Sequence, residues 1–140
     1  MSDEPADSRM TGEPADSRMT GEPADSREQR RALLLTDASP AAGIDYLVRL
    51  EAAGAGVRVT VDYVPDKLVL RPAALGAYMA ALRADGLEAL AVTVLDDLNN
   101  EVVPRFVRLR LAGADGHMAL LADRQPNWDN PALLAQLERF

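Results

Sequence analysis

The sequence predicts an α+β domain in which two β-hairpins flank a pair of helices, preceded by a disordered N-terminal segment. Apolar and polar residues alternate with period two in two pairs of neighbouring segments, as they do in half-buried strands. Between those pairs the apolar spacing changes to three and four residues, which is typical of helices. This order predicts one antiparallel sheet with both helices packed on the same face.

The first part of the chain is a repeat that predicts disorder over residues 1–30. Residues 4–12 read EPADSRMTG, residues 13–21 repeat them without a change, and residues 22–27 repeat the first six. Pro, Gly, Ser and acidic residues dominate the unit, so burial cannot offset the entropy lost on ordering it. The folded domain is therefore predicted over residues 31–140. A role for the repeats as a multivalent recruiting peptide stays open.

The first hairpin is predicted from two alternating segments, residues 44–50 and 57–63. A loop of Ala and Gly, residues 52–56, separates them. Short Gly-containing loops between alternating segments are typical of hairpins. The residues expected to face the core are Ile44, Tyr46, Val48, Leu50, Val57, Val59, Val61 and Tyr63.

Two helices are predicted next. The first begins at Pro72, a residue suited to the first helical turn, and ends at Gly86. Its apolar positions are Leu75, Tyr78, Met79 and Leu82. The second runs from Leu87 to Leu98, with an apolar stripe at Leu87, Leu90, Ala91, Val94, Leu95 and Leu98. Asp96 and Asp97 are expected to be solvated at the end of this helix.

The second hairpin is predicted from residues 106–111 and 117–123, which are joined by a Gly-containing loop over residues 113–116. A short helix over Pro131–Arg139 comes next, and Trp128 is expected to anchor this C-terminal segment against the sheet.

Composition excludes several classes of function. The 140 residues carry a formal charge of −7, and residues 1–27 alone contain seven acids and three arginines. The remainder is close to neutral, which gives no general basis for nucleic-acid binding. The chain has no cysteine, which excludes a thiol nucleophile, a disulfide and a thiolate metal site. We predict no membrane span and no signal peptide, and therefore a cytoplasmic protein.

Five segments, in order along the chain, resemble the nitrile reductases of the queuosine pathway. They are residues 45–51 (DYLVRLE), 63–67 (YVPDK), 94–98 (VLDDL), 103–107 (VPRFV) and 124–128 (RQPNW). The resemblance covers roughly residues 43–128. It implies the tunnelling fold (T-fold), a ββααββ unit that assembles in rings. It also implies an activity, the reduction of cyano-deazaguanine to its aminomethyl form with NADPH.

The same resemblance shows which of the family's site residues this chain lacks. The segment that carries the family's catalytic cysteine and acidic aspartate is replaced by residues 52–56. The glutamate that binds the purine-like base falls on Arg71, and the family's Phe-His-Glu motif falls on Glu88–Leu90. The turn that serves NADPH corresponds to residues 114–117 and is not preserved. We therefore predict no nitrile reductase activity, no catalytic residue and no cofactor.

The function predicted from this pattern is that of a non-catalytic tunnelling-fold subunit. It would act by assembly, as a homo-oligomeric ring or as a hetero-oligomer with a related subunit. One alternative is an enzyme of different chemistry in an intersubunit pocket; another is a binder of a small anionic, purine-like or pterin-like ligand. Arg71, Glu88 and His117 are the candidate ligand-binding residues. His117 is the one histidine, so no metal site is predicted.

Four arginines predict a basic face on the sheet. They are Arg49, Arg58, Arg108 and Arg110. Such a face could line the channel of a ring and bind anions. The simpler interpretation is a solvated sheet face, partly neutralised by Asp45 and Asp62.

Overall fold

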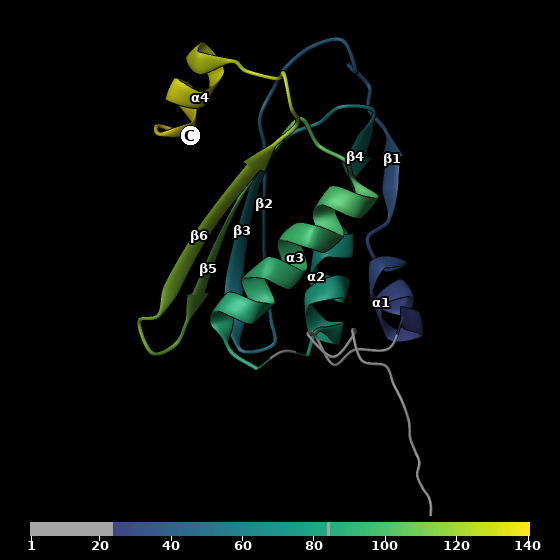
Figure 1. Ribbon diagram of the computed structural model, residues 1–140, viewed down its shortest axis with the longest axis vertical. Helices are drawn as coiled ribbons and strands as arrows, with labels where there is room; N and C mark the ends of the chain where they lie inside the picture. The colour runs from purple at the N-terminus through teal and green to yellow at the C-terminus, as the bar shows by residue number, and fades with distance from the viewer. Residues whose placement is uncertain (1–23, 84) are drawn as a thin grey trace, which may run out of the picture. The chain divides into compact units, whose positions relative to one another are not determined.

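The computed structural model of the protein describes residues 24–83 and 85–140 (Figure 1). The chain divides into two units between Arg30 and Arg31. Helix α1 spans Ala24–Arg31, so residues 24–30 of the predicted disordered segment are helical. The two complete repeats lie outside the described residues. The second unit, residues 31–140, contains every strand and the other three helices of the described chain.

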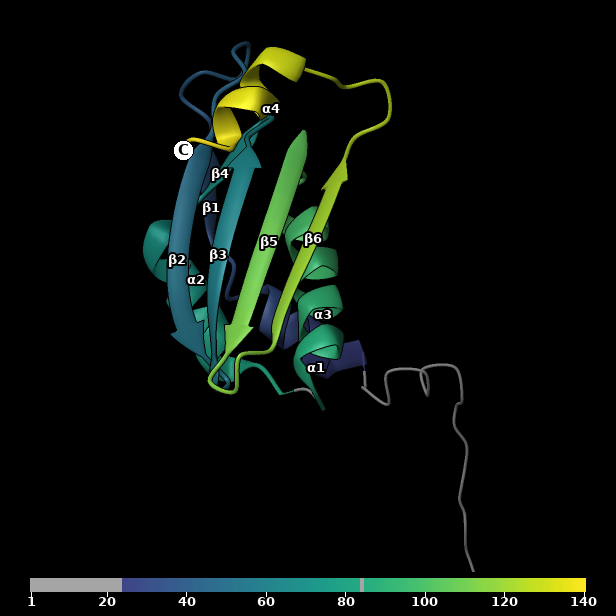
Figure 2. The same ribbon diagram turned by 90° about the vertical axis from the view of Figure 1, so that its left-hand side faces the viewer.

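The second unit has the predicted ββααββ order. Its sheet consists of β2 (Val48–Gly54), β3 (Val57–Val64), β5 (Phe106–Gly113) and β6 (Met118–Arg124). The strands pair antiparallel in the order β2-β3-β5-β6, and the sheet does not close into a barrel. Helices α2 (Pro72–Ala81) and α3 (Leu87–Glu101) lie on one of its faces (Figures 1 and 2). The α+β, tunnelling-like class is therefore confirmed.

The first hairpin is displaced from its predicted position. β2 begins at Val48, and Ile44 is 61% exposed, so the predicted strand over 44–50 starts too early. β2 instead continues to Gly54, which pairs with Val57. The turn is only Ala55 and Gly56, whose φ angles are 56° and 79°. Positive φ at both turn residues matches the twist of a two-residue hairpin. The predicted five-residue loop was wrong. Ala and Gly do not differ enough in polarity to show the apolar–polar alternation of a strand.

Gly54 also lets a helix approach the sheet closely. A Cβ atom at this position would lie 2.7 Å from the backbone carbonyl carbon of Met79 in α2. Such a separation is a steric overlap, so any larger residue would push α2 away from β2. The small residues of this segment therefore set the distance between the helix and the strand.

The helices differ from prediction at their ends. The apolar positions of α2 are buried as expected, but the helix ends at Ala81 rather than at Gly86. Gly86 instead precedes α3, with a φ of 113°. α3 continues past Leu98 to Glu101. Val103 lies just beyond it in the left-handed region with a φ of 49°, and Pro104 prevents further helix.

A second, small sheet was not predicted. β1 (Thr36–Ala38) and β4 (Leu68–Leu70) pair antiparallel, with Thr36 opposite Leu70. Strands of three residues are too short for a period-two pattern to be recognised. This sheet places Arg71 directly at the start of α2.

The C-terminal segment packs on the other side of the main sheet. Helix α4 (Pro131–Leu137) lies across the sheet from α2 and α3 (Figures 1 and 2). It belongs to a separate apolar cluster with Val64, Phe106 and Trp128. The rings of Phe106 and Trp128 are 6.0 Å apart, as expected from the predicted anchoring role of Trp128. No helix in the described part of the chain is long and apolar enough to cross a membrane.

Candidate functional site

Arg71, the first candidate ligand residue, is paired with a carboxylate. Its Nε and terminal nitrogen both donate to the carboxylate oxygens of Asp37, each at 3.0 Å. These hydrogen bonds raise the pKa of Arg71 and lower the pKa of Asp37. Both side chains are exposed. The guanidinium thus ties β1 to the start of α2.

Glu88 and His117 lie together at a different place. Oε1 of Glu88 and Nε2 of His117 are 3.7 Å apart, and both side chains are largely exposed. Arg71 comes directly after Leu70, which shares a small cavity with Leu98 near the end of α3. Glu88 lies ten residues before Leu98 in that helix, about 15 Å along its axis. Within one copy of the chain, Glu88 and His117 therefore lie together and Arg71 lies elsewhere. Ligand binding by these three residues stays a prediction.

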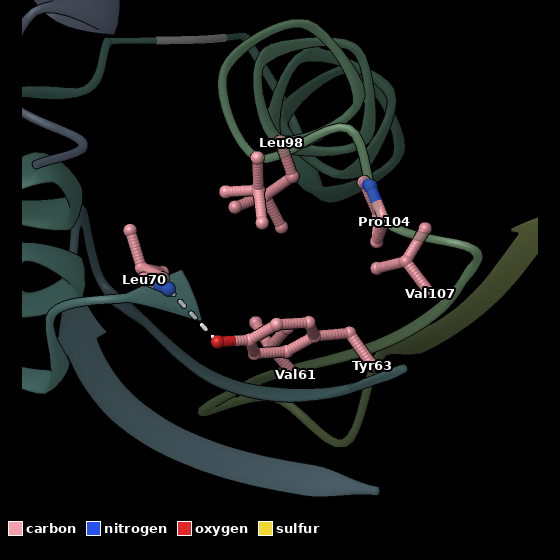
Figure 3. A pocket seen from close by; sticks show the side chains of 7 residues that line it. Val61, Tyr63, Leu70, Leu98, Pro104 and Val107 are labelled. Atoms are coloured by element: carbon pink, nitrogen blue, oxygen red, sulfur yellow. Dashed lines mark hydrogen bonds between the residues drawn. The ribbon is translucent and has the colours of Figure 1, made fainter. Parts of the chain in front are cut away.

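The cavity beside Leu70 is apolar and small (Figure 3). Its volume is about 10 Å³, close to the minimum that one water molecule needs. The lining residues are Val61, Tyr63, Leu70, Leu98, Val102, Pro104 and Val107. The Tyr63 hydroxyl accepts a hydrogen bond from the Leu70 backbone N–H at 2.9 Å, and burial raises the pKa of this phenol. This space is a gap in core packing and is too small for a purine-like ligand.

An open groove lies between the segment before β2 and helix α4. It measures about 490 Å³ and is lined by Asp45, Tyr46, Leu47, Leu133, Gln136, Arg139 and Phe140. Its size suits a small ligand better than the apolar cavity does. The Asp45 carboxylate in its wall, however, is already used by other side chains.

Asp45 belongs to a polar network that joins the segments of the family resemblance. It accepts hydrogen bonds from Asn130 at 3.0 Å, Trp128 at 3.1 Å and Arg105 at 3.1 Å. These contacts, with that of Asn130 the largest, lower the pKa of Asp45. Arg105 also pairs with Asp66 at 3.1 Å. Four of the five segments that resemble the family therefore contact one another through this polar network.

The four arginines of the predicted basic face do lie on the sheet face opposite α2 and α3, which we call the open face. Arg49 and Arg108 both pair with Asp62, at 2.6 and 3.1 Å. The hydrogen bond with Asp62 raises the pKa of Arg49. Asp62 was expected to be solvated but is only 2% exposed. Asp45 does not neutralise this face, because it pairs with Arg105 instead.

A buried polar cluster lies between the helices and was not predicted from the sequence. Asp97, expected at a solvated helix end, is 0% exposed. It accepts hydrogen bonds from the Tyr78 hydroxyl of α2 and from Nε of Arg31, the latter at 2.6 Å. Spacing could have revealed it, because Asp97 comes seven residues after Leu90 and three after Val94. It therefore continues the apolar stripe of α3.

No group of three His, Asp or Glu side chains in residues 24–83 and 85–140 is arranged to hold a metal ion. The described residues thus offer a groove, a set of surface arginines and two buried aspartates. None of these reproduces a nucleophile beside a general acid.

Comparison with known proteins finds relatives that match part of the chain. No family model matches the chain. It is similar to proteins named NADPH-dependent 7-cyano-7-deazaguanine reductase from several bacteria. Identity to that of Acidithiobacillus ferrooxidans is 32% over 83 residues, which cover 55% of this chain and 59% of the relative. Identity to that of Nitrosococcus oceani is 32% over 80 residues, which cover 53% and 62%.

The relative from Nitrosomonas europaea is 41% identical over 54 residues, which cover 37% of this chain and 39% of that protein. The matches span at most about three-fifths of the relatives' length. Sequence similarity and the ββααββ order agree with each other. The folded part of this chain is therefore similar to the 7-cyano-7-deazaguanine reductases over part of its length.

Proposed function

We propose that this protein is a non-catalytic relative of these reductases, acting as an assembly or partner subunit in a ring or a hetero-oligomer in the cytoplasm. The observation that carries the proposal is the unprotected edge of the sheet. β6 lies at the end of the strand order and pairs only with β5. Its first five residues, Met118–Ala122, carry no charge, and Met118 and Leu120 are each 59% exposed. Apolar edge strands favour pairing with another chain.

The proposed lack of nitrile reductase activity is supported by the residues of this chain. It contains no cysteine to add to a nitrile carbon. The position that corresponds to the base-binding glutamate is Arg71, whose guanidinium can only donate hydrogen bonds. A donor there cannot replace an acceptor for the donor edge of a purine-like base.

Native mass measurement tests the assembly. We expect the purified full chain to form an oligomer, alone or with a second protein from its own cells. Leu120→Lys puts a charge on the β6 edge and should shift the mass towards the monomer. Ala80→Lys adds the same charge at an exposed position of α2 and should leave the mass unchanged. A monomeric wild-type chain that captures no partner would contradict assembly.

Turnover tests the catalytic part separately. The purified protein is incubated with 7-cyano-7-deazaguanine and NADPH, and NADPH oxidation is monitored. We expect no turnover. Reduction of the nitrile by this chain alone would overturn the non-catalytic assignment without affecting the assembly.

A further inference from the structure

The open face of the sheet carries four arginines, and the acids of β2 and β3 on that face are Glu51 and Asp62. Strand register places Arg49, Asp62 and Arg108 in one row across β2, β3 and β5. Arg110 lies two residues after Arg108, on the same face of β5. Arg58 lies opposite Ala112, so it is a diagonal neighbour of Arg110. Diagonal neighbours in antiparallel sheets are about 7 Å apart, within reach of two long side chains to one ligand.

Two of these arginines have no carboxylate partner among residues 24–83 and 85–140. Asp62 is occupied by Arg49 and Arg108. In the part of the chain that the structure describes, Arg58 and Arg110 form no ion pair, and both are exposed. Glu51 lies in the row of Arg110, two strands and about 10 Å away, and it is a diagonal neighbour of Arg58, about 7 Å away. Among the described residues, no ion pair joins Glu51 to either arginine. The chain is acidic as a whole, so this positive patch is local.

An acidic side chain from the C-terminal segment already approaches the patch. Oε2 of Glu138, the residue after α4, is 3.6 Å from a terminal nitrogen of Arg108. The Glu138 side chain is 75% exposed, so little packing holds it there. α4 itself is fixed by the separate cluster of Val64, Phe106 and Leu137 rather than by the main core. The Glu138 carboxylate thus occupies the position beside Arg108 that a bound anion would take.

We propose that the open face binds a multiply charged, phosphate-type anion between Arg58 and Arg110, with Arg108 as a third donor for which Glu138 competes. The guanidinium group presents several fixed N–H donors and matches phosphate oxygens in pairs. A diphosphate carries charged oxygens at both ends and can contact two arginines at once. This site goes beyond the proposed assembly, because all its residues lie on one copy of the chain.

Calorimetric titration of the full-length protein with inorganic pyrophosphate at low salt tests the site. Arg58→Gln and Arg110→Gln should each weaken binding about tenfold, since each removes a charge-assisted contact. Glu138→Gln should tighten it severalfold by removing the competitor. All three side chains are exposed or partly so, and melting without pyrophosphate should be unchanged.

Matched variants distinguish binding at a specific site from a general effect of the protein's net charge. Arg83→Gln removes an exposed arginine just beyond α2, and Asp96→Asn removes an exposed acid of α3; both should leave the affinity unchanged. Absence of pyrophosphate binding, or equal weakening by Arg83→Gln, would overturn the site. Equal tightening by Glu138→Gln and Asp96→Asn would overturn the competition. These readouts do not depend on oligomer mass or nitrile turnover, so either proposal can fail without the other.

Discussion

Two aspartates in this domain are almost completely buried, and their surroundings differ. Asp97 lies between α2 and α3, where it accepts from the buried Tyr78 hydroxyl and from Arg31. Asp62 lies on the open face between two guanidiniums, Arg49 and Arg108, whose side chains are 31% and 13% exposed. Arginines at a surface can turn to water if their partner is lost, but a phenol inside the helix layer cannot. The cost of a buried charge therefore depends on where its partners can go.

The largest effect is expected at Asp97. Asp97→Ala leaves the Tyr78 hydroxyl without this acceptor and opens a gap between the helices, so it should lower the free energy of unfolding by about 4 kcal/mol. Urea denaturation measures the change. Asp96→Ala, at the exposed neighbouring position, should change it by less than about 0.5 kcal/mol. A small effect of Asp97→Ala would show that water can reach the Tyr78 hydroxyl between the helices and replace the lost acceptor.

A smaller effect is expected at Asp62. Asp62→Ala leaves two arginines that can reach solvent, so the loss should be about 2 kcal/mol, measured in the same way. Glu51→Ala on the same face removes an exposed acid and should be near neutral. If Asp62→Ala costs as much as Asp97→Ala, the exposure of the partners does not govern the cost, and the comparison fails.

Asp45 extends the comparison to a partly exposed carboxylate. Its side chain is 26% exposed, and Asp45→Ala should cost about 1.5 kcal/mol at neutral pH through the lost contacts with Asn130, Trp128 and Arg105. Because its pKa is lower in the folded state, the carboxylate stabilises the fold above its ordinary pKa of 3.8. This contribution is lost as the pH falls below that value.

Unfolding free energies of wild type and Asp45→Ala should therefore converge as the pH falls below about 4, and stay apart above pH 5. If the difference in unfolding free energy stays constant down to the acid range, the ionised carboxylate is not what stabilises this polar network.

The smallest effect is expected at the end of the helix that carries Asp97. Val103 is β-branched and has a φ of 49°, a conformation that favours glycine. Val103→Gly should raise the free energy of unfolding by up to about 1 kcal/mol, measured by urea denaturation. Val92→Gly, at an exposed position inside α3, should instead lower it by about 1 kcal/mol. Destabilisation by both variants would show that Val103 gains more from its contacts than it loses to strain.

The sequence by itself determined the order of the main elements. Alternation at Val57–Tyr63 and the three- and four-residue spacing of Leu75, Tyr78 and Met79 depend only on which face of an element is buried, and this is a local property. The lack of cysteine was equally decisive about thiol chemistry. The family resemblance was also readable, because its segments keep their order and spacing.

The tertiary structure alone decided the ends of the elements and the charge partners. β2 continues through an Ala/Gly segment because β3 pairs with it, and α2 approaches there because Gly54 has no side chain. Asp62 and Asp97 are buried because arginines distant in sequence reach them. Arg71 and Glu88 are separated by the length of a helix. Such long-range pairings leave no local period, so only the folded chain brings the partners together.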